Sequence, residues 1–136
     1  MAVNNDPVFA KTPKHSAAAV SAANTNLDGS GTITTLLTAG ADGAIVTSLK
    51  CWGTVTSTAK RCNVFVSTDA GTTWKLHESA LMAAYTVANT TVQTAVTFVD
   101  KTIADAAIVL PASAKIGVTV QVAEAVVFTA EYSDLS

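Results

Sequence analysis

The chain has 136 residues, of which 49% are hydrophobic and only 13% are charged, and its formal net charge is −2. This length suits one domain with a real core, and the weak negative charge leaves no basic field that would hold nucleic acid. The N-terminus lacks the basic start and apolar core of a secretory signal, and no apolar run approaches the roughly 18 residues of a membrane helix. We therefore expect a protein made in the cytoplasm, without a membrane span.

Residues 1–15 are predicted to form an extended N-terminal arm. They contain two prolines, one hydrophobic pair, Val8-Phe9, and no periodicity. Prolines limit the conformations of a free chain, so ordering such an arm against a partner costs less entropy than ordering a glycine-rich tail. We expect Val8 and Phe9 to bind a groove of an adjacent subunit, while Lys11 and Lys14 meet acidic groups at its rim.

Residues 16–136 are predicted to form one β-sandwich domain. Short runs rich in Val and Thr, which suit a half-buried pleated surface, alternate with turn residues, and no convincing helical period is present. The candidate strands are 16–22, 32–38, 44–53, 62–68, 74–79, 92–100, 106–110, 116–122 and 125–132. Eight or nine short strands predict an all-β, antiparallel, jelly-roll-like sandwich. Most connections are short enough for hairpins; the longest, 80–91, should be a crossover between sheets or a short helix.

Residues 24–35, NTNLDGSGTITT, have oxygen-bearing side chains at alternate positions, Asn24, Asn26 and Asp28, followed by a glycine. This spacing is typical of calcium loops. The position of the bidentate glutamate in such loops holds Thr35, however, and Asp28 is the only carboxylate. One carboxylate does not hold a dehydrated divalent cation tightly, so we expect a polar turn rather than a metal site.

Cys51 and Cys62 are predicted to lie opposite each other on a hairpin whose turn is centred on Thr56-Ser57. The inward face of residues 44–55 is expected to carry Ile45, Leu49, Cys51 and Val55. The two cysteines would then be either a cross-strand disulfide or two buried thiols that act as small hydrophobic residues. Because the chain has no export signal, we expect free thiols.

Residues 67–74, STDAGTTW, match the Asp-box pattern S-x-D-x-G-x-T-W at Ser67, Asp69, Gly71, Thr73 and Trp74. The segment resembles the hairpin that recurs in sialidases and related propellers, where it is a structural turn away from the catalytic centre. We expect Asp69 to accept backbone N–H groups, Gly71 to adopt a positive φ and Trp74 to pack beneath the turn. Because the box occurs once in a chain too short for a propeller, it indicates a stable hairpin and not a glycosidase.

No motif in the chain builds an active site. His15 and His77 are isolated in sequence, and there is no metal-ligand spacing, phosphate-binding loop or nucleophile elbow. We therefore expect neither enzymatic activity nor a cofactor.

The first half of the chain resembles a group of small virion structural proteins of tailed bacteriophages and prophages. The resemblance covers about residues 8–70 and is clearest in ANTNLDGSGTI and TAGADGAIVTSL. It implies a capsid decoration (cement) protein, located on the capsid exterior after synthesis in the host cytoplasm. Its expected partner is the major capsid protein, and the expected oligomer is a homotrimer. The resemblance carries no catalytic residues over to this chain.

Two other classes stay open. Trp52, Trp74 and Tyr85 would suit a sugar-binding platform, so the chain could be a phage tail, neck or host-adhesion module that binds a cell-surface glycan. It could also be a stand-alone carbohydrate-binding β-sandwich. A glycan module usually acts as a monomer, whereas a decoration protein usually oligomerises, so solution mass separates the classes.

Overall fold

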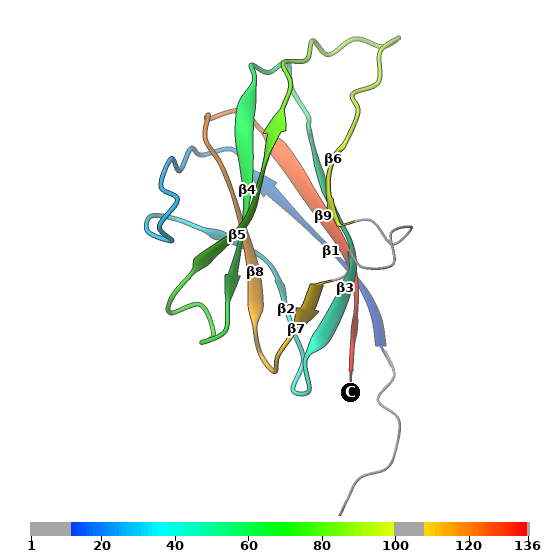
Figure 1. Cartoon of the computed structure of the whole chain (residues 1–136). Helices are drawn as coiled ribbons and strands as arrows, with labels where there is room; N and C mark the ends of the chain where they lie inside the picture. The colour runs from blue at the N-terminus through cyan, green and yellow to red at the C-terminus, as the bar shows by residue number, and fades with distance from the viewer. Residues whose placement is uncertain (1–11, 100–107, 136) are drawn as a thin grey trace, which may run out of the picture.

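The computed structural model of the chain describes residues 12–99 and 108–135. Within these residues the chain is all β, with nine strands in two antiparallel sheets, which confirms the predicted sandwich (Figure 1). No described segment is a helix that could cross a membrane. The strands are β1 (Thr12–Val20), β2 (Thr34–Thr38), β3 (Ala44–Gly53), β4 (Lys60–Ser67), β5 (Lys75–Met82), β6 (Val96–Val99), β7 (Ile108–Leu110), β8 (Lys115–Val120) and β9 (Val126–Asp134).

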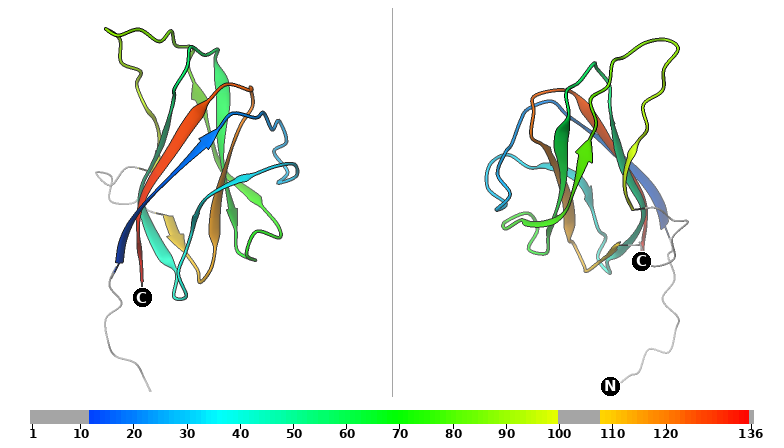
Figure 2. Two further views of the ribbon diagram at one scale, coloured as in Figure 1. Left: turned by 180° about the vertical axis from the view of Figure 1, so that it is seen from behind. Right: turned by 45° about the horizontal axis from the view of Figure 1, so that its top comes forward.

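The two sheets pack face to face, as the rear and tilted views show (Figure 2). The first, called sheet A here, has the order β1-β9-β3-β6, and β7 also pairs with β3; the second, sheet B, has the order β2-β8-β4-β5. The first strand begins at Thr12, not at the predicted Ser16, and its nine residues all pair with β9. Residues 12–15 of the predicted arm therefore belong to the sandwich, and residues 1–11 lie outside the described part of the chain.

Most connections do not form the hairpins that their lengths suggested. Among the connections that the structure describes in full, only residues 68–74, between β4 and β5, join two neighbouring strands of one sheet. The others pass from one sheet to the other, including residues 83–95, which confirms the crossover alternative and not the helix. Short loops join strands within one sheet as well as strands of different sheets, so loop length alone does not assign a strand to a sheet.

The predicted hairpin around Thr56-Ser57 is wrong for this reason. The strand that carries Cys51 lies in sheet A, where Cys51 pairs with Phe128, whereas Cys62 lies in sheet B and pairs with Val120. Both cysteines are nevertheless fully buried, as predicted, and they face each other across the core rather than along a hairpin.

A bulge in β3 also corrects the predicted inward face of this strand. The register with β9 shifts between Val46 and Ser48, so one extra residue interrupts the alternation of side chains. As a result Ala44 and Val46 are buried together with Leu49 and Cys51, and Ile45 is only half-buried. The fourth predicted member, Val55, lies beyond the strand and is exposed.

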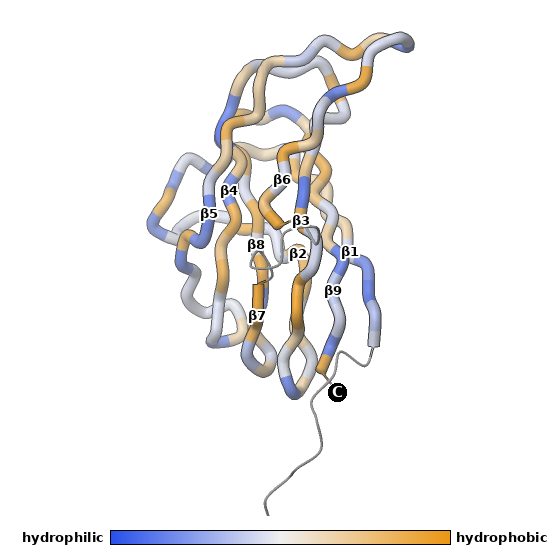
Figure 3. Tube along the Cα trace, turned by 45° about the vertical axis from the view of Figure 1, so that its right-hand side comes forward, coloured by the Kyte–Doolittle hydropathy of each residue, from blue (hydrophilic) through white to orange (hydrophobic). Residues whose placement is uncertain are grey.

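The core lies between the two sheets and is built from Val, Leu, Ile and Phe side chains. Phe98 and Phe128 stack in it, with ring centroids 6.4 Å apart. Figure 3 shows hydrophobic segments along the core strands and also on the connection between β5 and β6. The largest fully buried side chains are Phe65, Phe128, Leu49, Met82, Leu110, Ile116, Val46, Val64, Val99, Val118, Val120 and Val126.

One ion pair closes the core at the end where β3 stops and β4 starts. The ammonium of Lys60, whose side chain is 0% exposed, lies 2.7 Å from the carboxylate of Glu124. The backbone N–H and the hydroxyl of Thr58 donate to the same carboxylate. The hydrogen bond from Lys60 is the main cause that lowers the pKa of Glu124. Glu124 in the β8–β9 turn is therefore joined to the start of β4 through Lys60 and to the β3–β4 connection through Thr58.

Breaking this pair from its two sides should have unequal effects. Glu124→Gln leaves a buried ammonium without a counter-charge, whereas Lys60→Met removes the buried charge and leaves a carboxylate that Thr58 still satisfies. We expect Glu124→Gln to lower the urea midpoint of unfolding more than Lys60→Met does, and the double variant to recover part of the loss. An equal or smaller loss in Glu124→Gln would contradict this account.

Candidate functional site

The segment that resembles a calcium loop folds around the side chain of Asn24. This amide donates to the carbonyl oxygens of Ser30 at 3.1 Å and Thr32 at 2.9 Å, and its own oxygen accepts the backbone N–H of Asn26 at 3.0 Å. The backbone N–H of Asn24 donates in turn to Val120 in β8. Asn24 is therefore the internal brace of the loop and ties it to sheet B.

The carboxylate of Asp28 is used in the same local way. It accepts the backbone N–H of Ser30 at 3.0 Å and the Ser30 hydroxyl at 2.5 Å, and these hydrogen bonds lower its pKa. Within residues 12–99 and 108–135 no three His, Cys, Asp or Glu side chains gather as metal ligands would. These contacts support the polar turn, and the absence of a bound cation stays a prediction.

The Asp-box residues make the contacts expected of a structural turn. One oxygen of Asp69 accepts the backbone N–H of Thr73 at 2.8 Å and the hydroxyl of Ser67 at 2.7 Å, and the other accepts the Thr73 hydroxyl. The Ser67 hydroxyl oxygen accepts the N–H of Gly71, whose φ is +92°. These hydrogen bonds, that of the Thr73 hydroxyl first, lower the pKa of Asp69 to about 2.

The two loops that carry sequence motifs lie against each other on the outer face of sheet B. A methyl group at Gly29 would overlap the carbonyl oxygen of Trp74, and one at Gly117 in β8 would come within 2.8 Å of the Trp74 ring. The side chain of Ile33 reaches the same glycine of β8. A methyl group at Gly71 would also lie 3.8 Å from the Trp74 ring, so the indole packs against the Asp-box turn, and its residue also contacts a loop more than forty residues away in sequence.

The predicted partner-binding residues fall into two groups. Val8, Phe9 and Lys11 lie outside the described residues. Lys14 lies in β1, and its ammonium is 2.5 Å from the carboxylate of Asp134 at the end of β9. Asp134 also accepts the backbone N–H of Gly40 at 3.0 Å. The charge of Lys14 is thus paired within the chain, and its contact with acidic groups of another subunit stays a prediction.

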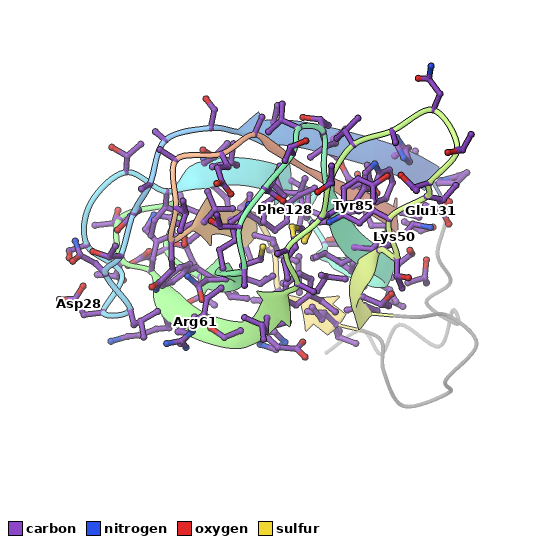
Figure 4. All side chains as sticks on the ribbon, turned by 90° about the horizontal axis from the view of Figure 1, so that it is seen from above. Asp28, Lys50, Arg61, Tyr85, Phe128 and Glu131 are labelled. Atoms are coloured by element: carbon purple, nitrogen blue, oxygen red, sulfur yellow. The ribbon has the colours of Figure 1, made fainter. Side chains whose placement is uncertain are left out.

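The aromatic residues do not form one platform. Trp74 lies under the Asp-box turn, whereas Trp52 and Tyr85 line a hollow of about 450 Å³ beside the β5–β6 connection. The Tyr85 hydroxyl donates to the carbonyl of Thr91, and Lys50 lies 5.8 Å from the centre of the Trp52 ring. Tyr85 and Lys50 are labelled in the view from above (Figure 4).

Sequence reasoning missed that the end of the molecule beside the β5–β6 connection has an apolar surface. Four large side chains exposed near it define what we call the crossover end: Val55, Leu81, Val87 and Val92, exposed to 42%, 70%, 49% and 94%. The signal was present, because hydrophobic residues recur through 80–92, but their exposure depends on the crossover standing off from the sheets (Figures 1 and 3). No described residue there forms a catalytic cluster.

The role of Asn24 can be tested with a matched pair of variants. Asn24→Asp replaces the amide that donates to two carbonyls by a carboxylate that repels them, so we expect a loss of about 1–3 kcal/mol in unfolding free energy. Asn26→Asp should change little, because Asn26 contributes its backbone N–H to the loop.

Melting temperatures with excess calcium and with chelator should agree within about 2 °C. A large calcium shift that Asp28→Ala abolishes would show a metal site instead.

The Asp69 contacts predict a pH dependence with a definite sign. Because the pKa of Asp69 is lowered to about 2, its carboxylate stabilises the folded protein above the ordinary Asp range. This contribution should fall as the pH drops from about 4 towards 2. Asp69→Asn should therefore melt below the parent at pH 7, and the difference should shrink near pH 2. Asp42→Asn, in the exposed β2–β3 turn, is the control and should melt like the parent at both pH values.

Comparisons with known proteins add no family to this description: no protein-family model, no curated protein and no solved structure matches the chain. Any assignment of function therefore depends on the sequence and on the surfaces described above.

Proposed function

We propose that this protein is a non-enzymatic structural subunit of a tailed-phage virion, a decoration (cement) protein on the capsid exterior. It would be made in the host cytoplasm and would stabilise the capsid by bridging major capsid protein subunits. The proposal has two supports: the resemblance of residues 8–70 to phage virion proteins, and the apolar crossover end. The crossover end is the observation on which we rely most.

The crossover end has the character of a contact surface. Leu81 and Val92 are more exposed than large hydrophobic residues usually are, and two further valines lie near them. Burial of such side chains against a partner stabilises the complex by about 25 cal/mol per Å² of apolar surface removed from water. A chain with only 13% charged residues also has few charges that would oppose such association.

The start of β1 is well suited to carry a mechanical load. Its nine residues all pair with β9, and the Lys14–Asp134 ion pair lies at the end where the chain enters the strand. A pull on residues 1–11 along the strand would therefore act on the whole ladder at once. This supports the proposal that Val8, Phe9, Lys11 and Lys14 attach the sandwich to a neighbouring subunit.

Self-association would complete this role. In closed symmetry the same patch is buried on every copy. A homotrimer would therefore bury the crossover end, or another apolar surface, on each of its three copies. Stable contacts of this kind bury on the order of 1,000 Å² or more, which is sufficient to cross-link capsid subunits.

A second candidate function rests on the hollow beside Trp52. The hollow is lined by the aromatic rings of Trp52 and Tyr85 and by the polar side chains of Thr91 and Gln93. Aromatic rings with polar groups beside them are suited to binding a sugar. This favours, as the alternative, a tail, neck or host-adhesion module that binds a cell-surface glycan, or a stand-alone carbohydrate-binding domain.

Deletion of residues 2–11 tests the decoration role and leaves all of β1 in place. The isolated protein should keep its melting temperature, while its copy number on purified full heads falls and the heads lose resistance to heat or osmotic shock. The double variant Val87→Ser/Val92→Ser should also bind heads or neighbouring copies less well. Val109→Ser, an equally simple change at an exposed valine of β7, is its control.

The contrary outcomes are distinct. If the shortened chain decorates heads as tightly as the full chain, the N-terminal segment has no role in attachment. If the full chain never binds heads, the decoration role is wrong. Quenching of tryptophan fluorescence by host oligosaccharides, lost in Trp52→Ala, would then establish the glycan-binding alternative.

A further inference from the structure

Cys51 and Cys62 form an isolated pair of thiols in the centre of the sandwich. Each is completely buried, one on the inner face of sheet A and the other on the inner face of sheet B. Both belong to the same core cluster, and the interaction between the two thiols shifts the pKa of each, so their side chains lie next to each other between the sheets. Figure 4 shows sulfur atoms in this interior region, close to Phe128.

The surroundings of the pair differ from those of ordinary core residues. Lys60 lies two positions before Cys62 and has a fully buried side chain, and its positive charge favours the thiolate form of both cysteines. The hydrogen bond from Cys51 lowers the pKa of Cys62, while the same bond, together with burial, raises the pKa of Cys51. The pair therefore loses one proton more easily than two. Thiol–disulfide exchange needs one thiolate that attacks the disulfide and a second thiol close by that resolves the mixed disulfide.

We propose that Cys51 and Cys62 form a dithiol redox site that closes into an inter-sheet disulfide by exchange with a small disulfide oxidant such as glutathione disulfide. The thiolate of one cysteine attacks a sulfur of the oxidant, forms a mixed disulfide and releases one glutathione thiolate. The sulfur of the second cysteine, after losing its proton to solvent, then attacks the protein sulfur of the mixed disulfide and releases the second glutathione. Two protein thiols are oxidised, and one glutathione disulfide is reduced to two glutathione molecules.

Burial determines when this exchange takes place. Glutathione disulfide does not fit into the closed core, so the reaction requires opening of the sandwich or a chain that is still folding. A reducing cytoplasm keeps the thiols free, in agreement with the expectation from the sequence. A change to an oxidising medium closes the bond and joins two sheets that otherwise contact each other through side-chain packing and loops.

The test uses the full chain. The reduced protein is unfolded in urea and refolded with either reduced glutathione or a mixture containing glutathione disulfide, then denatured and alkylated without reductant. After refolding in reduced glutathione, both cysteines should be alkylated. After refolding in the oxidising mixture, neither should be, and the chain should stay a single uncrosslinked polypeptide without attached glutathione. The oxidised protein should melt about 5–10 °C higher, because the bond closes a loop of the unfolded chain and so lowers its conformational entropy. Dithiothreitol should reverse the shift.

Three results would overturn the proposal: two free thiols after refolding with the oxidant, a glutathione adduct or inter-chain dimer as the main product, or an oxidised form that melts no higher than the reduced one. Cys51→Ala and Cys62→Ala are the matched controls, and neither should show a higher melting temperature after oxidation. Because the main measurement uses the unaltered chain, it decides the question even if a control variant fails to fold.

Discussion

Trp74 and Ile33 both pack onto Gly117, and this contact requires a residue without a side chain in the middle of β8. Any larger residue would overlap Ile33 and press on the indole ring. The contact covers the outer face of sheet B with two loops that come from distant parts of the chain. It therefore explains why the central strands of this sheet are buried on both faces: Phe65 beside Gly117 is as fully buried as the inward-facing Val64 and Val118.

The same contact involves two sequence motifs that each resemble a known functional pattern, and both motifs contribute to it. The Asp-box turn positions Trp74 through hydrogen bonds within a few residues, and Asn24 shapes the 21–33 loop in the same local manner. Each loop then supplies one half-buried side chain, Ile33 or Trp74, to the cover over the outer face of sheet B. Residue patterns that are typical of calcium loops and of sialidase hairpins serve here to close a β-sandwich.

The strands were predictable from the sequence, whereas the assignment of strands to sheets was not. Short β-type runs between turn residues located the nine strands of the described residues, with bounds that differ by up to four residues, and the Asp box was recognised because its hydrogen bonds are local. Contacts between distant residues carry no such signal. The Lys60–Glu124 pair joins residues 64 positions apart, and nothing near either one in sequence indicates it. The two cysteines were correctly brought together, but on a hairpin that does not exist.

The pairing of β1 with β9 places the start of the first strand and the end of the last strand at the same end of the sandwich. Thr12 lies opposite Asp134, so both ends of the described chain leave the sandwich at one end, whereas Gly53 and Val126 lie at the other end, near the crossover (Figure 1). Nine paired residues span about 30 Å along the strands. The segments that precede Thr12 and follow Asp134 are therefore joined to the sandwich side by side, about 30 Å from the crossover end. A partner bound through these segments and a partner bound at the crossover end would therefore lie at opposite ends of the sandwich.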